Sequence, residues 1–499
     1  MFGSLVLLWL AACLVFLLFR NRRDKNFPPG PPALPIFGNL LQLNLKNPSK
    51  DLVKLASQYG NVYSLFLGCR KVVIISGLQA MKEAFITKAA DCSGRPQDLM
   101  INHSVQRKVH APGIVLSDYS SGWREHRRFT LMTLRNLGMG KESMEGRILE
   151  ETRNIVKILE DSVGKKIAPQ KLFHNAASNI ICAVLLGTNH NYNEFIQLFD
   201  QIVRENSKIL NGRWAMIYDS LPMVRLLPLP FWQVFKNFKI GQQKVMELLV
   251  KHKKTRVPGK PRDFIDCYLD ELDKRGHDRS SFSEDQLSSI FVDLHFAGSD
   301  TTTSTLLTAF LYLSTHPQIQ KKCQQEIDKV MEGKDHVTFE DRHQMPYIEA
   351  VIHEVQRIGN IAPLGVFHLT SNDIELMGYS IPRGTILIPN MTSVLNEEGQ
   401  WKFPHEFNPE NFLNNQGEFV KPAAFMPFSI GPRMCLGENL ARMELFLIIV
   451  ILLGKFQFIW PEDAGKPDYT PLFGSTQYPK PYQMKIQFRE NPQKLLNSM

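Results

Sequence analysis

The segment from Phe428 to Gly437, which reads FSIGPRMCLG, constrains the fold of this chain more than any other stretch. It sets Cys435 between Gly431 and Gly437 and places Arg433 two positions before the cysteine. Glycines on both sides let the backbone approach a flat group closely, and the arginine suits a carboxylate partner. A free cysteine is usually just a small buried apolar residue. Five fixed letters at this spacing, however, arise by chance with a probability on the order of 10⁻⁴. We therefore expect Cys435 to be an axial thiolate ligand of haem iron.

The spacing Phe-x-x-Gly-x-Arg-x-Cys-x-Gly resembles the haem-binding signature of the cytochromes P-450, and every fixed position of that signature is met. The resemblance implies that Cys435 supplies the proximal thiolate to haem b and that Arg433 pairs with a haem propionate. It extends over essentially the whole chain. It is closest to the animal microsomal group known as family 2, which oxidises drugs and fatty acids, and residues 127–141 are typical of that group.

Composition narrows the class of protein further. The seven cysteines are an odd number without paired spacing, which argues against a disulfide framework and favours a reducing compartment. The formal net charge of +9 suits nucleic acid, an anionic membrane or an acidic protein partner. No zinc-finger spacing, RNA-binding signature or long basic arm accompanies this charge, so nucleic acid is not an expected partner.

The first 20 residues predict a membrane anchor. Residues 2–19 are almost wholly apolar and long enough to cross a bilayer as one helix, and a basic stretch follows at residues 20–25. A cleaved signal peptide would carry its positive charge before the apolar run. Charge after the run favours retention in the lipid bilayer, with the rest of the chain in the cytosol.

Residues 21–35 are basic and then rich in proline, which predicts a stiff hinge between the anchor (1–20) and a catalytic domain at residues 36–499. Microsomal members of the family have the same layout. The resemblance therefore implies the endoplasmic reticulum membrane, with the catalytic domain facing the cytosol.

Most of the catalytic domain is expected to be helical. Helical patterns fill most of residues 120–360, whereas residues 62–67 and 72–76 are rich in strand-forming residues and predict a hairpin. Two more short strands are expected within 374–388, around Arg383-Gly384. The fold class is mainly α with small β-sheets, and the resemblance implies the cytochrome P-450 fold preceded by one N-terminal transmembrane helix.

An apolar loop with three prolines occupies residues 221–232 (LPMVRLLPLPFW). Such a loop is either an irregular piece of core or an exposed surface that meets a membrane. The resemblance favours the membrane, since the family dips a loop at this place, over the substrate pocket, into the bilayer.

A long helix is expected after residue 283. Ser283 and Gln286 form a capping-box pattern, and helical periodicity then continues to Pro317. The helix should therefore span about 45 Å and cross the whole domain.

The middle of this helix reads AGSDTT at residues 297–302, where glycine and threonine weaken helical regularity. Asp300 and Thr301 offer an acid and a hydroxyl able to pass protons. The resemblance assigns both to the oxygen side of the haem and implies that Ala297 and Gly298 leave space over the iron.

The resemblance adds further site residues. Trp123 and Arg127 are four apart and share a helix face, and the family pattern assigns both, together with His368, to the haem propionates. Glu354 and Arg357 have salt-bridge spacing, and in the family this pair is a buried structural brace.

Two positions depart from the family pattern. The third member of the brace is usually an arginine or histidine, whereas this chain has Asn411, which hydrogen-bonds but brings no charge. Phe367 stands where close relatives usually place proline, which bears on the pocket wall beside His368.

Arg124, Arg128 and Arg135 are expected on the same helix as Trp123. By the resemblance they belong to a basic face that docks the acidic flavin domain of the NADPH–cytochrome reductase, with cytochrome b5 as a further partner. Electrostatic steering of that partner would explain part of the positive charge.

These features together predict a haem-thiolate monooxygenase that inserts one oxygen atom from O2 into a lipophilic substrate such as a fatty acid, a steroid or a xenobiotic. Two alternatives stay open. One is a haem-thiolate isomerase or dehydratase acting on peroxides, which tends to lose the acid–threonine pair, and the other is a haem-binding protein without turnover. The candidate pocket residues are all apolar: Ile114, Phe291, Leu294, Ala297, Leu364, Val366 and Phe473.

Overall fold

Helical periodicity dominates the chain, and the computed structural model is correspondingly rich in helices. The structure describes residues 23–106, 111–138, 142–187, 193–210, 213–276, 281–474 and 476–490. The helices are α2 (Ser49–Tyr59), α3 (Leu78–Lys82), α4 (Ala89–Cys92), α5 (Met100–Gln106), α6 (Ser121–Asn136), α7 (Glu142–Glu160), α8 (Gln170–Leu186), α9 (Asn193–Leu210), α10 (Arg213–Ser220), α11 (Phe231–Thr255), α12 (Phe264–Arg275), α13 (Glu284–Thr315), α14 (Pro317–Val330), α15 (Pro346–Gly359), α16 (Met391–Leu395) and α17 (Glu438–Lys455).

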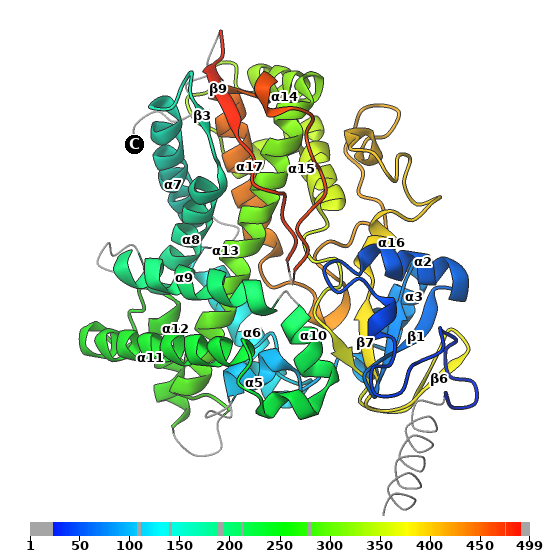
Figure 1. The fold of residues 1–499 in the computed structure, drawn as a ribbon. Coiled ribbons are helices and arrows are strands. Elements are labelled where there is room, and N and C mark those ends of the chain that lie inside the picture. The colour runs from blue at the N-terminus through cyan, green and yellow to red at the C-terminus, as the bar shows by residue number, and fades with distance from the viewer. Residues whose placement is uncertain are drawn as a thin grey trace, which may run out of the picture.

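The strands are short and form three small sheets. They are β1 (Val62–Leu67), β2 (Arg70–Ile75), β3 (Lys166–Ile167), β4 (His368–Leu369), β5 (Ile374–Leu376), β6 (Tyr379–Ile381), β7 (Ile386–Pro389), β8 (Phe456–Ile459) and β9 (Met484–Phe488). The sheet orders are β1-β2-β7-β4, β3-β9-β8 and β5-β6. Figure 1 shows the four-stranded sheet on one side of the molecule and most helices on the other, with α13 running through the middle beside α17. The expected mainly α architecture with small sheets is confirmed.

The predicted hairpin is present, and the region around residue 383, where two short strands are expected, holds three: β5, β6 and β7. β1 and β2 are antiparallel, with Val62 opposite Ile75. β6 and β7 do flank Arg383-Gly384, but β7 pairs in parallel with β2 instead of with β6. β6 pairs with a third strand, β5, through Met377-Gly378, where both residues have positive φ (49° and 81°) and so close a tight two-residue turn.

The described part of the predicted hinge is packed onto the domain and is not a free spacer. The backbone N–H of Ser64 on β1 donates to Pro29 O at 2.7 Å, and Arg23 Nε donates to Ser64 Oγ at 2.8 Å. Phe27 is buried in the same region. The predicted anchor at residues 1–20 lies outside the described residues, and within those that are described no helix is both long and apolar enough to cross a membrane.

The long helix α13 begins where the capping pattern places it. Ser283 Oγ accepts a hydrogen bond from Gln286 N at 3.1 Å. The Gln286 amide does not close the capping box. It donates to Gly113 O at 2.8 Å and so ties the start of α13 to the loop before α6.

Gly298 on α13 serves helix packing, which corrects the expectation that it leaves space over the iron. A Cβ at this position would lie 2.8 Å from Ile181 Cγ1 on α8. The glycine therefore lets α8 and α13 approach closely. The Ala297 side chain is exposed on a helix that is otherwise mostly buried.

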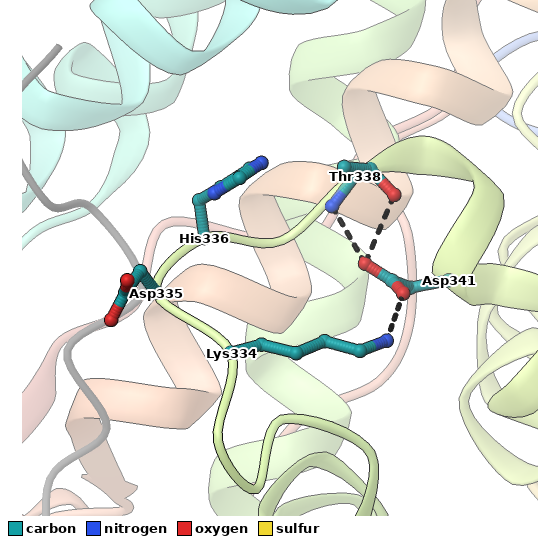
Figure 2. A pocket seen from close by; sticks show the side chains of 5 residues that line it. All are labelled: Lys334, Asp335, His336, Thr338 and Asp341. Atoms are coloured by element: carbon teal, nitrogen blue, oxygen red, sulfur yellow. Dashed lines mark hydrogen bonds and ion pairs between the residues drawn. The ribbon is translucent and has the colours of Figure 1, made fainter.

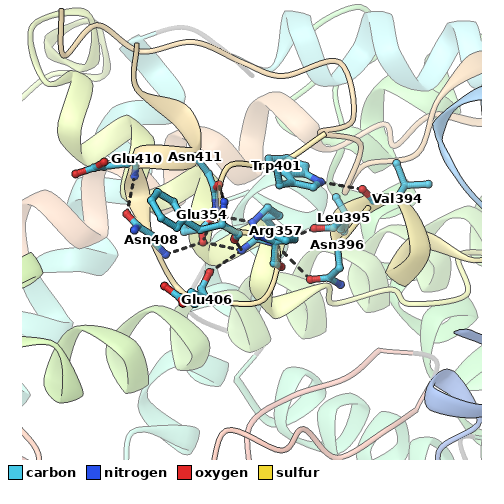
Figure 3. A network of polar contacts seen from close by, with 12 residues as sticks. Glu354, Arg357, Val394, Leu395, Asn396, Trp401, Glu406, Asn408, Glu410 and Asn411 are labelled. Carbon is cyan, nitrogen blue, oxygen red and sulfur yellow. Dashed lines mark hydrogen bonds and ion pairs between the residues drawn. The ribbon is translucent and has the colours of Figure 1, made fainter. Parts of the chain in front are cut away.

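Glu354 and Arg357 on α15 form the ion pair that their spacing predicts, and it is buried, as the family resemblance implies (Figure 3). Both side chains are 0% exposed. Arg357 Nε and Nη2 donate to the two carboxylate oxygens of Glu354 at 2.7 and 2.8 Å. The remaining guanidinium hydrogens reach the carbonyl oxygens of Leu395, Pro404 and Glu406, each at 2.8 Å. One side chain thus fixes a long irregular segment against α15.

Asn411 replaces the charged third member of the brace with an amide, which both donates and accepts hydrogen bonds here. Its Nδ2 donates to Glu354 Oε1 at 3.2 Å, and its Oδ1 accepts from Phe403 N at 2.8 Å. Asn408 N adds a further donor to Glu354 Oε1 at 2.8 Å. The buried carboxylate is therefore satisfied without a second positive charge.

Replacing Arg357 with lysine should destabilise the protein by about 3–5 kcal/mol, the usual effect of breaking a buried ion pair. Lysine has no planar fork with which to reach Glu354 and the carbonyl oxygens together. The matched control is Lys402→Gln, which removes an exposed pair with Glu410 in the same region and should change the free energy of unfolding by under about 1 kcal/mol. Urea unfolding of both variants measures the difference, and equal losses would contradict the brace.

Candidate functional site

The loop that carries Cys435 folds back on itself and presents the sulfur. Cys435 N donates to Phe428 O at 2.9 Å, and Met434 N donates to Gly431 O at 3.1 Å. Gly437 N–H points at the sulfur, with N and Sγ 3.4 Å apart. α17 begins at Glu438, so the positive end of its helix dipole also lies beside the sulfur. Both features stabilise a thiolate at this position.

Gly431 is required by the close approach of two segments. Its φ is +76°, and a Cβ there would lie 1.9 Å from Phe85 O. No other residue fits without moving the backbone. The signature glycine thus docks the cysteine loop against the segment Glu83–Thr87.

The Cys435 thiol is open on one side and otherwise surrounded by protein. Burial raises its pKa, which the Gly437 N–H and the charge of Arg127 partly oppose. Without a further positive partner the group therefore stays a thiol at neutral pH. A bound metal ion removes the proton outright, which suits a cysteine held open for iron.

Arg433 is buried and only partly satisfied. Its Nε donates to Ser93 O at 2.9 Å and its Nη2 to Ser117 O at 2.8 Å. Its Nη1 is buried and has no hydrogen-bond partner. Burial lowers the pKa of Arg433 to about 10, and the nearby charge of Arg127 adds to that effect while Asp118 opposes it.

Trp123 is a platform for this arginine. The Arg433 guanidinium lies 4.0 Å from the centre of the indole ring, and that of Arg127 lies 5.6 Å from it. The single N–H of the indole donates to Ile114 O at 2.9 Å. Trp123 therefore orients Arg433 through the face of its ring, while its indole N–H is already bonded to Ile114 O.

Arg95 is the third cation of this cluster, and it is a buried residue that sequence reasoning missed. Its Nε donates to Val115 O at 3.1 Å and its Nη1 to Phe367 O at 2.8 Å. Burial lowers its pKa, and the neighbouring charges of Arg433 and Arg127 lower it further. Its partners lie up to 272 residues away in the chain, so no local spacing announces it.

His368 closes the cluster as a neutral ring. Its Nδ1 lies 2.7 Å from Cys92 O, and since a carbonyl oxygen only accepts, Nδ1 carries the hydrogen. Burial lowers the pKa of His368, and the charges of Arg95 and Arg433 add to the effect. β4 holds the residue opposite Leu387 of β7.

The cluster fits the propionates of a haem. Asp118 is the one carboxylate, among the residues that the structure describes, whose charge raises the pKa of Arg95 and Arg433. Buried charges are stable only when paired, so three guanidinium groups require further negative charge. The unpartnered Nη1 of Arg433 shows where one such group is missing a hydrogen-bond acceptor.

The acid and the hydroxyl of α13 point to different neighbours. Thr301 Oγ1 donates to Ala297 O at 2.7 Å, which leaves its oxygen lone pairs able to accept, on the side where Ala297 is exposed. Asp300 Oδ2 accepts a hydrogen bond from Thr476 Oγ1, which lies on the C-terminal loop before β9. Burial raises the pKa of Asp300, and this hydrogen bond opposes the rise.

A second missed residue, Asp293, joins α13 to the haem-side loop. Its Oδ2 accepts from Ile114 N at 2.7 Å and from Val115 N at 2.9 Å. Burial raises its pKa to about 6, although both backbone donors oppose the rise. Because Ile114 O accepts from Trp123, one buried carboxylate positions the platform beneath Arg433.

A third missed residue is Glu444 on α17, which lies beside the side chain of Thr302 on α13. The carboxyl is fully buried, and burial raises its pKa to about 8. It is therefore protonated at neutral pH. This contact joins α17, the helix that follows Cys435, to α13, the helix that carries Thr301.

The expected pocket residues fall into two groups. Val366, at 41%, and Ala297 are exposed, and Leu364 and Phe473 are half-buried, so these four have surface to offer a substrate. Ile114, Leu294 and Phe291 are buried. Phe291 lies against Phe199 and His295, with ring centres 6.1 and 6.3 Å apart.

Phe367, the departure before His368, is half-buried and packs with Leu364 against an apolar cluster of the four-stranded sheet. Its carbonyl oxygen accepts from Arg95. Its side chain therefore supports the sheet side of the wall, and its backbone helps to hold the cation cluster.

Two other polar groupings have structural explanations. Figure 2 shows a surface pocket in which Asp341 accepts hydrogen bonds from Thr338 N and Oγ1 at 2.8 and 3.0 Å, as part of a capping box. Asp341 also pairs with Lys334 at 2.6 Å. The only grouping with metal-ligand spacing among the described residues is His252, Asp263 and Asp266. Its carboxylates are engaged by His252 and by Arg262, so the cluster is an ion-pair network.

Comparison with known proteins agrees with this geometry. The Cytochrome P450 family model matches residues 28–486. The chain is 40% identical over 481 residues to cytochrome P450 2D10 of Mus musculus, covering 96% of this chain and 95% of that protein. It is 39% identical over 492 residues to the Vitamin D(3) 25-hydroxylase of Sus scrofa (97% and 98%), and 39% identical over 476 residues to cytochrome P450 2D6 of Homo sapiens (94% and 95%).

These relatives place the chain with the animal family 2 proteins. The chain belongs to the cytochrome P450 family, whose members are haem-thiolate monooxygenases that receive electrons from a redox partner and oxidise lipophilic substrates with O2.

Proposed function

We propose that this chain hydroxylates or epoxidises lipophilic molecules at the endoplasmic reticulum membrane, with electrons from NADPH delivered by the NADPH–cytochrome reductase and with cytochrome b5 as a second donor. The observation that carries the proposal is the open Cys435 thiol beside three buried or half-buried arginines, one of which has an unpartnered Nη1. A haem with two propionates satisfies both features at once.

Each residue of the cluster has a distinct task in holding the haem. Cys435 would ligate the iron, and Arg433 Nη1 would donate to a propionate, while Arg95, Arg127 and His368 surround the same negative charge. When bound, the haem supplies electron transfer and O2 activation. The Gly437 N–H moderates the thiolate, because a hydrogen bond to the sulfur tunes its electron donation.

The proton supply falls to Asp300 and Thr301. Burial raises the pKa of Asp300, which favours the protonated acid and so suits the carboxyl to hold a proton for delivery. Thr301 offers its oxygen as an acceptor on the open side of α13 while its hydrogen is held by Ala297 O. The presence of this pair favours monooxygenation over the isomerisation of peroxides and over a haem carrier without turnover.

The membrane side is supported by an exposed apolar segment at Pro222–Leu226 and the start of α11. Leu226 is 88% exposed, Met223 68% and Leu227 51%. The same segment lines a hollow with Pro228, Pro230 and Trp232. Exposed apolar area of this kind is favourable against lipid, and it adds to the anchor proposed at residues 1–20.

The electron side is supported by the basic face of α6. Arg124, Arg128 and Arg135 are exposed, whereas Trp123 on the same helix is buried in the site. An acidic flavin domain that docks on these arginines lies one helix away from the haem. Charge complementarity of this kind raises the association rate.

The substrate is proposed to be an apolar molecule of the size of a steroid, a fatty acid or a drug. The accessible wall residues Val366, Leu364 and Phe473 are apolar. A relative named as a Vitamin D(3) 25-hydroxylase is consistent with hydroxylation of a large lipophilic substrate.

The thiolate assignment predicts the effect of Cys435→Ser. This variant should lose the thiolate-specific absorption band of the reduced carbon monoxide complex, because a serine hydroxyl is not an anionic sulfur ligand. Cys69→Ser, at a half-buried cysteine on the turn between β1 and β2, is the control and should keep the band. Survival of the band in Cys435→Ser would contradict the assignment.

The proton assignment predicts the effect of Thr301→Ala. NADPH consumption should continue, while hydrogen peroxide formation rises and product per NADPH falls by about tenfold or more. The reason is that the proton delivery in which the Thr301 hydroxyl takes part is impaired. The control is Thr303→Ala, which removes a buried hydroxyl bonded to Ser299 O on the same helix. Peroxide and product assays with purified reductase measure the ratio, and equal coupling in both variants would refute the role of Thr301.

A further inference from the structure

The Asp300 carboxyl is held from outside its own helix. Thr476 Oγ1 donates a hydrogen bond to Asp300 Oδ2, and the two residues are 176 positions apart in the chain. Thr476 is only 6% exposed, so water does not compete for the contact. A surface threonine would not be fixed in this way.

The loop that carries Thr476 is itself anchored next to this contact. Gln477 N donates to Ile361 O at 2.8 Å. The Gln477 amide donates to Gly359 O at 3.0 Å and to Asn360 O at 2.8 Å, at the C-terminal end of α15. These bonds fix the backbone beside Thr476, so its hydroxyl is placed against Asp300 in advance.

A hydroxyl is suited to a partner that changes its protonation state. Thr476 Oγ1 donates its hydrogen when Asp300 is ionised, and its lone pairs accept when Asp300 is protonated. Lysine or arginine would stabilise only the ionised carboxylate, and a carbonyl oxygen only the protonated acid. Thr476 therefore keeps the carboxyl in one place through a full cycle of proton gain and loss.

The titratable groups around Asp300 come from two elements. Burial raises the pKa of Asp300, while the Thr476 hydrogen bond and the charge of His174 on α8 lower it. Tyr478, on the same loop as Thr476, has its own pKa raised by burial and by the charge of Asp300. Removal of the Thr476 hydroxyl therefore leaves burial less opposed and should raise the pKa of Asp300.

We propose that Thr476 is a positioning residue that holds the Asp300 carboxyl in place while it gains and loses the proton used in catalysis. The inference rests on the proton role proposed above for Asp300. Its effect on catalysis passes through the Asp300 carboxyl, which its hydroxyl contacts.

Four full-length variants test the proposal: Thr476→Val, which keeps the shape and removes the hydroxyl, Thr476→Ser, which restores it, Thr308→Val as the control, and Asp300→Asn as the reference without the carboxyl. Thr308 is a buried threonine of α13 whose hydroxyl bonds to Ser304 O. The first readout is the infrared carboxyl band of Asp300 as a function of pH, identified by its loss in Asp300→Asn. The second is product per NADPH across the same pH range.

In Thr476→Val the carboxyl band should persist to higher pH than in the unaltered protein, and product per NADPH should fall roughly fivefold, the ratio that corresponds to one hydrogen bond. Thr476→Ser and Thr308→Val should behave as the unaltered protein does. An unshifted titration in Thr476→Val would overturn the proposal, as would a Thr476→Ser variant as impaired as the valine.

Failure of the proposed function gives a different result. Unchanged product per NADPH in Asp300→Asn would overturn the proton role of Asp300 itself. Loss of coupling in Asp300→Asn, together with a normal titration in Thr476→Val, would overturn only the role given to Thr476.

Discussion

An excess of buried positive charge beside Cys435 is the constraint on which the rest of this structure depends. Arg433 stacks on Trp123 at 4.0 Å with one nitrogen unpartnered, and burial and mutual repulsion lower the pKa values of Arg433 and Arg95. A protein does not maintain such an arrangement without an anion to complete it, because unpaired buried charge costs several kcal/mol. The two propionate carboxylates of a haem would supply that anion, which is why we infer that the polypeptide is built around this group.

The surrounding elements hold that cluster from three directions. Gly431 docks the cysteine loop against Phe85, and β4 places His368 from the sheet. From the distal side, Asp293 on α13 fixes Ile114, whose carbonyl oxygen in turn orients Trp123. The helix that carries the acid–threonine pair is therefore linked by two hydrogen bonds to the platform of the cation cluster. The segment of α13 that carries Asp300 and Thr301 and the cation cluster around Arg433 are therefore held together by the same hydrogen bonds.

Sequence reasoning reached the residues whose partners are set by short spacing. The signature letters identify Cys435 and Arg433, and the i,i+3 spacing identifies Glu354 and Arg357. Arg95, Asp293 and Thr476 were missed because each is a lone polar residue whose partner is distant in the chain, and only the fold brings them together. Gly298 is expected over the iron, but its missing side chain instead allows α8 to pack closely against α13. The sequence does not show this, because a glycine in a helix does not indicate which of its neighbours needs the space. Asn411 shows the converse case, because a departure from the family pattern keeps the hydrogen bonds and loses only the charge.

The charge requirement at the cation cluster is the central claim, and binding of a haem without propionate charges tests it most directly. Haem-free protein should be titrated with iron protoporphyrin IX and with its dimethyl ester, which keeps the ring and the iron but removes both negative charges. Two charge-assisted hydrogen bonds at roughly 1.5–3 kcal/mol each predict that the ester binds at least about 100-fold more weakly. Equal affinity for the two forms would contradict the account.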